Sequence, residues 1–442
     1  DSLASADSTS QSRLDLRVNS LIVRRSSLRY DQLDAEATPG RLNHRHLHVN
    51  NISAHVILKA LTSDSLNVNV KRLAFDEQSG LSVRRLAMKL EGNYNKAELT
   101  GFGLQLPASA LLADSVTATY DAEHLAETLR FGGRLNDSHL DVADLSFLLP
   151  SLRSIDETLV MAADFSGTAH GVNLSHLDVT AQSGRLALQA SGSMSRDDAL
   201  TSWQARVQHF YASSDLLAKV RETTGMLPDE LLRAGHLRLS GEAQGNSAGD
   251  MEGQGSLKSD IGALTFALHA DSDKRIRGNV QTDSLDLGLL LNNEDLGQTA
   301  AFFNVIGTSG DMKAEGHVAR LDYKGYHYQN IHLDGSYRQG TIGGKLKIDD
   351  PNLQTDIEGE MSRQKRASIR LTGIVERLVP SALHLTDRWG DAVFSAIVDA
   401  DFMASSLNDA EGSIDLDDFT MREADALGTR YHLENMHVKS GF

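Results

Sequence analysis

Apolar and polar residues alternate along most of this chain, and this period of two constrains its fold more than any other feature. Leu66, Val68 and Val70 are separated by asparagines, and every second residue from Phe394 to Phe402 is apolar. Because successive side chains of a strand point to opposite faces of a sheet, each such segment has one apolar and one polar face. The sequence therefore predicts a mostly β protein of antiparallel strands with one face in water.

A Leu-x-Gly phrase returns within many of these segments, for example at Gly241, Gly335 and Gly373. Glycine inside a strand usually marks a bend or a bulge, although each one alone is equally compatible with a nearby hairpin turn. The spacing between the phrases is irregular, which argues against a solenoid of fixed period. The pattern favours a long sheet that bends at a similar level on many strands.

Helical signals are few and short. Asp215 and Asp286 have the residue type and position of helix N-caps. The expected helical pieces are residues 144–152, 214–221 and 228–232, with weaker signals at 285–291 and 375–383. These pieces are separated by strands, so we expect them to cap or plug a sheet and not to serve as the crossovers of a parallel α/β fold.

The apolar faces of so many strands must be covered, and the sequence offers no second layer of helices. The chain also has only 13 Phe, 9 Tyr and 2 Trp, fewer aromatic anchors than we expect of large closed sandwiches. We therefore predict a long, twisted antiparallel sheet folded lengthwise into an open, taco-like groove with an apolar interior. The candidate lining residues are Leu66, Val68, Val70, Val83, Leu86, Met88, Leu186, Leu188, Leu237, Leu239, Leu264, Phe266, Leu268, Leu346, Ile348, Ile369, Leu371, Phe394, Val398, Ile414 and Leu416.

Composition excludes several classes of protein. The chain has no Cys, so it is neither a disulfide scaffold nor a Cys-ligated zinc or iron–sulfur protein. Lys and Arg number 43 against 60 Asp and Glu, a formal charge of −17, which disfavours nucleic acid as a partner. No stretch approaches the ~20 apolar residues of a membrane-spanning helix.

The sequence predicts no catalytic residue, metal site or cofactor, and so no enzyme. His44, His46 and His48 alternate and would share one strand face, where they could hold Zn²⁺ or Cu²⁺, but a solvated face is favoured because nothing nearby supplies a second shell. The acidic runs at 349–350 and 415–418 lack the spacing of a calcium loop. There is no Gly-x-Ser-x-Gly elbow, and the glycines at 307 and 310 precede an expected strand instead of a helix.

Several basic residues could contact lipid headgroups, although a solvated outer face is the favoured interpretation. They are Arg24, Arg25, Arg72, Arg84 and Arg85, and a further basic cluster at 363–366 is expected at a hairpin tip.

One stretch resembles a known family. Residues 321–340, with 344–352 and 357–360, are similar to the Bacteroidetes branch of the TamB proteins, which belong to the AsmA-like superfamily. Residues 138–152 and 382–387 also look like that branch, and the resemblance is specific across about residues 280–390. TamB chains are longer, with an inner-membrane helix and a C-terminal domain that are not visible here. We therefore expect a middle piece of a longer chain.

The resemblance implies a repeating β-groove that crosses the periplasm of a Gram-negative bacterium. It implies a non-enzymatic, bridge-like lipid transfer segment that carries phospholipid between the inner and outer membranes. The expected partners are phospholipid, an outer-membrane barrel of the TamA/BamA type, and the inner membrane through a segment outside this chain. No nucleic acid is expected.

Two other functions are also compatible with the sequence. One is an assembly factor that holds unfolded outer-membrane proteins by β-augmentation, and the other is a secreted β-solenoid adhesin or carbohydrate-active protein, which the low aromatic count disfavours. The expected organisation is a mobile lead-in at 1–12, a first groove half at 13–212, a helical insertion at 213–235 and a second groove half at 236–442, truncated at an open end.

Overall fold

A computed structural model describes residues 16–34, 36, 38, 40–62, 65–121, 123–197, 199–225, 227–362, 367–404, 411–423 and 428–440. The predicted lead-in at 1–12 and the basic cluster at 363–366 lie outside the described residues. The chain divides into two compact units, unit 1 up to Leu227 and unit 2 from Pro228 onward. This boundary falls inside the predicted helical insertion at 213–235, so that the insertion contributes to both units.

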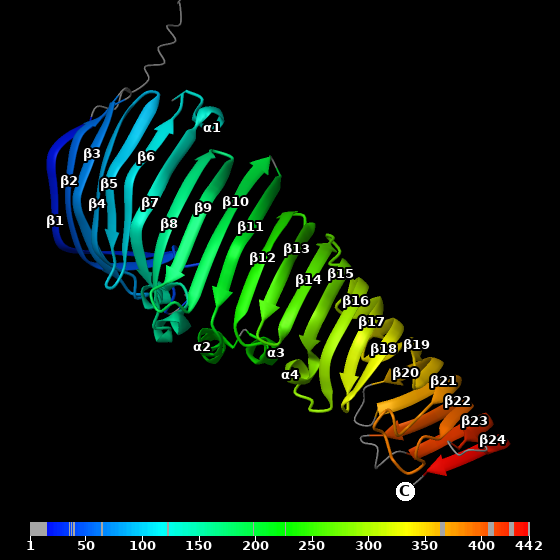
Figure 1. Ribbon diagram of the computed structural model, residues 1–442. Helices are drawn as coiled ribbons and strands as arrows, with labels where there is room; N and C mark the ends of the chain where they lie inside the picture. The colour runs from blue at the N-terminus through cyan, green and yellow to red at the C-terminus, as the bar shows by residue number, and fades with distance from the viewer. Residues whose placement is uncertain are drawn as a thin grey trace, which may run out of the picture. The chain divides into compact units, whose positions relative to one another are not determined.

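Unit 1 is an antiparallel meander in which each strand pairs with the next along the chain (Figure 1). Its strands are β1 (Leu16–Asp31), β2 (His46–Leu61), β3 (Ser65–Glu77), β4 (Ser82–Asn93), β5 (Lys96–Gln105), β6 (Ala110–Thr119), β7 (Arg130–Asp141), β8 (Thr158–Thr168), β9 (Gly171–Ala181), β10 (Leu186–Asp197) and β11 (Leu200–Ala212).

Unit 2 repeats this topology. Its strands are β12 (Leu237–Asn246), β13 (Met251–Ser259), β14 (Gly262–Ala270), β15 (Ile276–Asp286), β16 (Leu296–Thr308), β17 (Asp311–Tyr323), β18 (Tyr326–Arg338), β19 (Thr341–Asp350), β20 (Leu353–Ser362), β21 (Ala367–Leu378), β22 (Val393–Ala404), β23 (Glu411–Arg422) and β24 (Arg430–Ser440). The predicted fold class, a mostly β chain of antiparallel strands, is confirmed.

The described helices are short, as predicted. They are α1 (Leu125–Thr128), the 3₁₀ helices η1 (Val142–Phe147) and η2 (Pro150–Ser154), α2 (Ser214–Thr224), α3 (Asp229–Arg233) and α4 (Leu287–Leu291). Only α1 has no counterpart in the sequence prediction. The prediction of a helix at 375–383 is wrong, because β21 continues to Leu378, where it pairs with Leu353, and is followed by turns.

The two predicted N-caps have different outcomes. The Asp286 carboxylate accepts the backbone N–H of Leu289 and caps α4, as predicted. The prediction for Asp215 is wrong, because the N-cap of α2 is Ser213, whose backbone is extended and whose hydroxyl accepts the N–H of Leu216. Asp215 already lies in the first turn, where its carboxylate accepts the Ser213 hydroxyl at 2.5 Å.

The connections at the two ends of the strands differ in kind. At one end, which we call the tight-turn margin, short turns join the strands, such as Gln339 and Gly340 between β18 and β19. At the other end, the covered margin, the connections include η1 and η2 in unit 1 and α4 and residues 379–392 in unit 2. Figure 1 shows α4 at the same strand ends as α3 within unit 2. The exception is α1, which lies at the tight-turn margin of unit 1.

Glycines lie within the strands where neighbouring backbones approach closely. Gly335 pairs with Gly344, and Gly344 pairs with Gly359. Gly344 has φ +158°, and a Cβ built on it would overlap the carbonyl oxygen of Asp334. Only glycine tolerates this conformation at this separation, so a side chain at 344 would force the strands apart.

Many of the buried apolar residues of each unit lie at the covered margin. In unit 2, four of them form a cluster: Tyr328, Ile331, Ile348 and Leu383. In unit 1 the buried Leu216 and Leu217 come from α2, at the same strand ends as the buried Ala181 of β9. The sheets are therefore packed against covering segments at this margin.

Candidate apolar groove

Strand pairing shows which residues share a face. In unit 2, Leu239 pairs with Leu257, and Leu257 pairs with Leu264. Directly paired residues of an antiparallel sheet point to the same side, so the pairing defines one apolar face, which we call the inward face. The predicted lining residues of unit 2 all lie on it: Leu237, Leu239, Leu264, Phe266, Leu268, Leu346, Ile348, Ile369, Leu371, Phe394, Val398, Ile414 and Leu416.

Unit 1 has an inward face of the same kind. Val70 pairs with Met88, and Leu188 pairs with Val179. The break in the alternation at Arg84 and Arg85 coincides with a register shift between β3 and β4, which restores the apolar residues to one side. The predicted residues on this face are Leu66, Val68, Val70, Val83, Leu86, Met88, Leu186 and Leu188.

The inward face of unit 2 is nearly free of charge. Among the described positions that pairing assigns to this face in β12–β24, only Asp350 carries a carboxylate, ammonium, guanidinium or imidazole group. The opposite face alternates with it and carries residues such as Glu242, Gln254 and Lys347. A surface without charges is suited to contact hydrocarbon, because an unpaired charge there would be costly.

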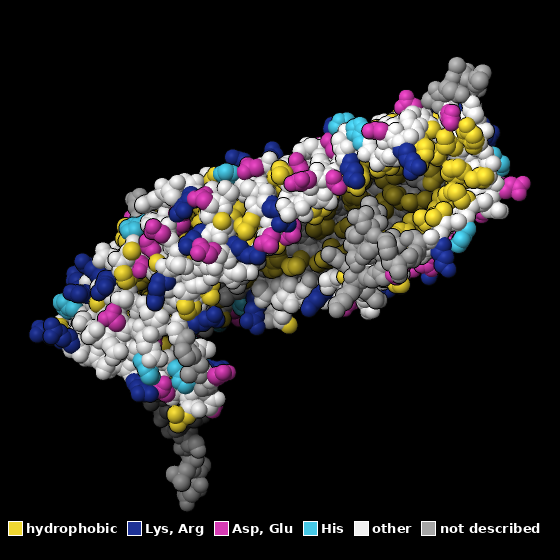
Figure 2. Space-filling model, turned by 90° about the horizontal axis from the view of Figure 1, so that it is seen from below, with side chains coloured by type: hydrophobic (Ala, Val, Ile, Leu, Met, Phe, Trp, Pro, Cys, Tyr) yellow, Lys and Arg dark blue, Asp and Glu magenta, His cyan; other side chains and the backbone are white. Residues whose placement is uncertain are grey.

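This face is covered at one margin and open at the other. On β18 and β19, Ile331 and Ile348 near the covered margin are 7% and 8% exposed, whereas Tyr337 and Ile342 near the tight-turn margin are 41% and 47% exposed. Figure 2 shows an elongated hollow lined by hydrophobic side chains, at the left-to-right position that the strands of unit 2 occupy in Figure 1. An open apolar groove therefore runs along unit 2.

Residues 379–392 form the floor of this groove at β17–β21. Leu383 is fully buried against Tyr328, Ile331 and Ile348. The segment is fixed at both sides of this contact. The Val379 N–H donates to the Asn352 carbonyl at 3.0 Å, and the His384 Nδ1 lies 3.0 Å from the Lys324 carbonyl oxygen.

Asp350 is the one charged residue among the described positions that pairing assigns to the inward face of unit 2, and its carboxylate is fully hydrogen-bonded. Its carboxylate is 1% exposed and accepts the Tyr326 hydroxyl at 2.5 Å and the backbone N–H groups of Gln329 and Asn352 at 3.2 and 2.9 Å. Burial, and then the hydrogen bond to Asp350, raises the pKa of Tyr326. The sequence could have placed Asp350 on this face, because the residue continues the alternation of Leu346 and Ile348. The arrangement stabilises the turn between β19 and β20.

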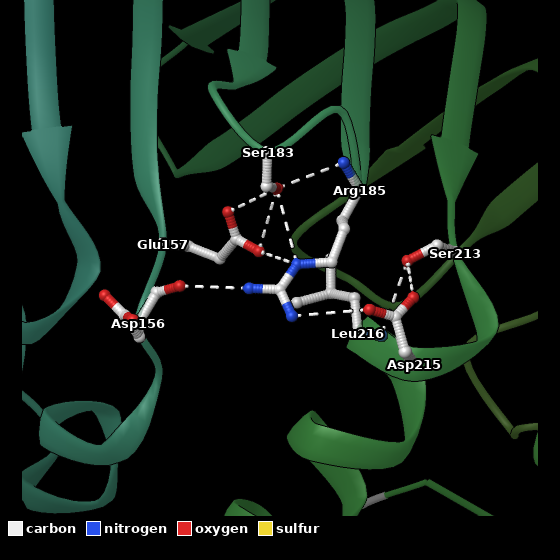
Figure 3. Close-up of polar contacts among 7 residues, drawn as sticks. All are labelled: Asp156, Glu157, Ser183, Arg185, Ser213, Asp215 and Leu216. Atoms are coloured by element: carbon white, nitrogen blue, oxygen red, sulfur yellow. Dashed lines mark hydrogen bonds and ion pairs between the residues drawn. The ribbon is translucent and has the colours of Figure 1, made fainter.

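In unit 1, an ion-pair network joins the residues just before β8, the turn before β10, and α2 (Figure 3). The Glu157 side chain, only 3% exposed, lies 2.5 Å from the Arg185 Nε and accepts the Ser183 hydroxyl at 2.8 Å. Arg185 also donates to the Asp156 carbonyl at 3.1 Å and lies 3.3 Å from Asp215. The carboxylates of Glu157 and Asp215 are both paired with Arg185, so the network anchors α2 at the covered margin.

The Arg185 network also sets two pKa values. Burial alone would lower the pKa of Arg185, but the hydrogen bond of Asp215 and the charge of Glu157 outweigh it and raise the pKa. The Ser213 hydroxyl, and then Arg185, lowers the pKa of Asp215.

The predicted trio of histidines does not form. His44 lies in a turn before β2, so only His46 and His48 project from the strand, both toward Asp31 Oδ1 at 3.1 and 3.0 Å. The Arg29 Nε lies 2.6 Å from the other oxygen of Asp31. Arg29, and then His48 and His46, holds the pKa of Asp31 well below its usual range. In the described part of the chain, no group of three or more His, Cys, Asp or Glu residues could hold a metal ion.

The predicted headgroup contacts in unit 1 lie away from the groove. Arg24, Arg25, Arg72, Arg84 and Arg85 are all exposed. Arg72 pairs with His55, on the side opposite the Val70 side chain, and Arg84 and Arg85 lie near the covered margin, at the start of β4. The structure therefore does not bring them to the open edge of the inward face.

Unit 1 shows the same gradient as unit 2, with Val179 buried near the covered margin and Val172 and Met194 exposed near the tight-turn margin. No helix among the described residues is long and apolar enough to cross a membrane. Comparisons with models of protein families, with curated proteins and with solved structures find no match to this chain.

Proposed function

We propose that this chain is a non-enzymatic lipid carrier whose apolar groove holds phospholipid acyl chains and lets them move along the sheet. The observation that carries the proposal is the inward face of unit 2, which is apolar across β12–β24 and remains open near the tight-turn margin. A protein that used this face only as a core would bury it, as the cluster around Leu383 is buried.

The energetics favour such a carrier. Each CH₂ group of an acyl chain that leaves water gains about 0.8 kcal/mol. Crossing water therefore costs a lipid many such contributions, whereas a chain that slides along an apolar groove exchanges one hydrocarbon contact for another. The polar headgroup stays at the open edge, where water remains available.

The cellular setting is a further part of the proposal. The resemblance of residues 321–340 and their neighbours to TamB proteins supports a place in the periplasm, between the inner and outer membranes. In this proposal the full-length protein is anchored in the inner membrane and works with an outer-membrane barrel of the TamA/BamA type.

Photo-crosslinking in lipid extract tests the proposal directly. A crosslinking residue at Leu239, Phe266 or Leu346 is expected to capture phospholipid. The matched controls are Ser240, Thr265 and Lys347, their chain neighbours on the opposite face. Equal capture by both sets would refute the groove, and capture of unfolded outer-membrane protein in place of lipid would favour an assembly factor.

A further inference from the structure

A group of cations lies at the tight-turn margin of unit 2. Lys274 and Arg275 lie in the turn between β14 and β15, and Arg277 and Lys313 lie on the outer face of β15 and β17. Arg277 and Lys313 pair with the same residue of β16, Ile306, from opposite sides. Since adjacent strands are ~4.8 Å apart, the backbones of Arg277 and Lys313 are about 10 Å apart.

These four cations lack the partners that other basic residues of this margin have. Arg338 lies 3.3 Å from Asp311, and Arg370 lies 3.0 Å from Asp401. Among the described residues, no carboxylate forms an ion pair with Lys274, Arg275, Arg277 or Lys313, and all four side chains are exposed. An unpaired group of this kind is notable in a chain with a formal charge of −17.

The nearby carboxylates are partly engaged elsewhere. Asp271 Oδ1 accepts the backbone N–H groups of Asp273 and Arg275, both at 3.0 Å, and so holds the turn. Glu252 lies 3.9 Å from His269. Asp273 and Glu315 are exposed and remain as competing negative charges.

The cations adjoin the mouth of the groove. Ile276, between Arg275 and Arg277, belongs to the inward face, and so does Met312, next to Lys313. Ile276 and Met312 both pair with Gly307, which has no side chain. Arg277 and Lys313 lie one position further along their strands, on the opposite face, and Lys274 and Arg275 lie in the turn. A lipid whose acyl chains lie on the inward face therefore reaches these cations when its headgroup extends past the sheet edge near Gly307.

We infer that Lys274, Arg275, Arg277 and Lys313 bind the phosphate of a phospholipid whose acyl chains occupy the groove beside β15–β17. Ammonium and guanidinium groups form strong, charge-assisted hydrogen bonds to phosphate oxygens. The inference rests on the proposed function and adds to it a site for the anionic headgroup.

The test compares two photoactivatable lipids with the same acyl chains, dioleoylphosphatidylglycerol and uncharged dioleoylglycerol. The variant is Lys274→Gln/Arg275→Gln/Arg277→Gln/Lys313→Gln. The control variant, Lys71→Gln/Arg72→Gln/Arg84→Gln/Arg85→Gln, removes the same charge from exposed positions of unit 1. Circular dichroism checks that each protein is folded.

We expect the unit 2 variant to capture about 5- to 10-fold less phosphatidylglycerol and to capture dioleoylglycerol as the wild type does, with a smaller difference at high salt because exposed charges are screened. Equal capture of phosphatidylglycerol by the wild type and the variant, or an equal loss in the control, would overturn the headgroup site. If the wild type captures neither lipid, the proposed groove function fails as well.

Discussion

The two margins of unit 2 are built from the same strands and carry the same alternation, yet one is a core and the other is open. Ile331 and Tyr337 lie on the same face of β18, but only Ile331 is covered, because Leu383 lies against it. Alternation therefore shows which face is apolar and not whether that face is filled. The segment laid over the strands decides between a core and a binding surface.

The largest expected effect is a difference in stability between substitutions at the two margins. Leu383→Ala leaves a cavity under residues 379–392 and should lower the free energy of unfolding by about 2–4 kcal/mol. The matched change Ile342→Ala, at the half-exposed tight-turn margin, should cost less than about 1 kcal/mol. Urea unfolding of both variants measures the difference, and similar losses would mean that both margins are packed.

A second pair tests the buried carboxylate of the covered margin. Asp350→Ala leaves the Tyr326 hydroxyl and two N–H groups without their acceptor and should lower the free energy of unfolding by about 1–3 kcal/mol. Asp349, its exposed neighbour, is the control, and Asp349→Ala should cost less than about 0.5 kcal/mol. If the two variants unfold at the same urea concentration, Asp350 contributes nothing that is specific to its burial.

A charge placed in the open groove should affect binding more than folding. Leu268→Glu places a carboxylate on the inward face, and Ala267→Glu places the same charge on the opposite face. We expect Leu268→Glu to remain folded and to reduce lipid capture at Phe266 by about 5-fold or more. An acyl chain that binds there would remove water from the introduced carboxylate, which costs free energy. Ala267→Glu should change capture little. Unfolding of Leu268→Glu would show a packed core at this position.

The smallest expected effect is the acid response of the β1–β2 contact in unit 1. Because the pKa of Asp31 is lower in the folded than in the unfolded chain, this contact stabilises the fold above about pH 4, and the stabilisation is lost as pH falls toward the folded value. Asp31→Asn should therefore show a smaller fall in melting temperature between pH 6 and pH 3. An unchanged acid response would mean that the contact contributes no stability.

The sequence predicted the strands well, and it grouped the apolar residues that strand pairing places on one face, because alternation reports directly on faces. It also located α2 and the Asp286 cap, because these signals depend on residues that are close together in the sequence. It failed at residues 375–383, where apolar residues such as Val375, Val379 and Leu383 recur at helical spacing. A strand end followed by turns that lie on a sheet also needs apolar residues there, so the spacing could not distinguish the two.

Other features depend on contacts that sequence spacing does not reveal. The histidines at 44, 46 and 48 alternate, but β2 begins at His46, and the partner of the remaining pair is Asp31 from another strand. Asp215 has the right residue type for a cap, yet Ser213 has the extended backbone that a cap requires. The cations at the groove mouth come together only through pairing across β16.

An experimental density map of the protein purified with phospholipid would test the central claim most directly. We predict elongated density, of the width of an acyl chain, along the inward face of unit 2 past Phe266 and Leu346, above the floor formed by Leu383. A map in which apolar side chains fill that space, with no room for a ligand, would contradict the account.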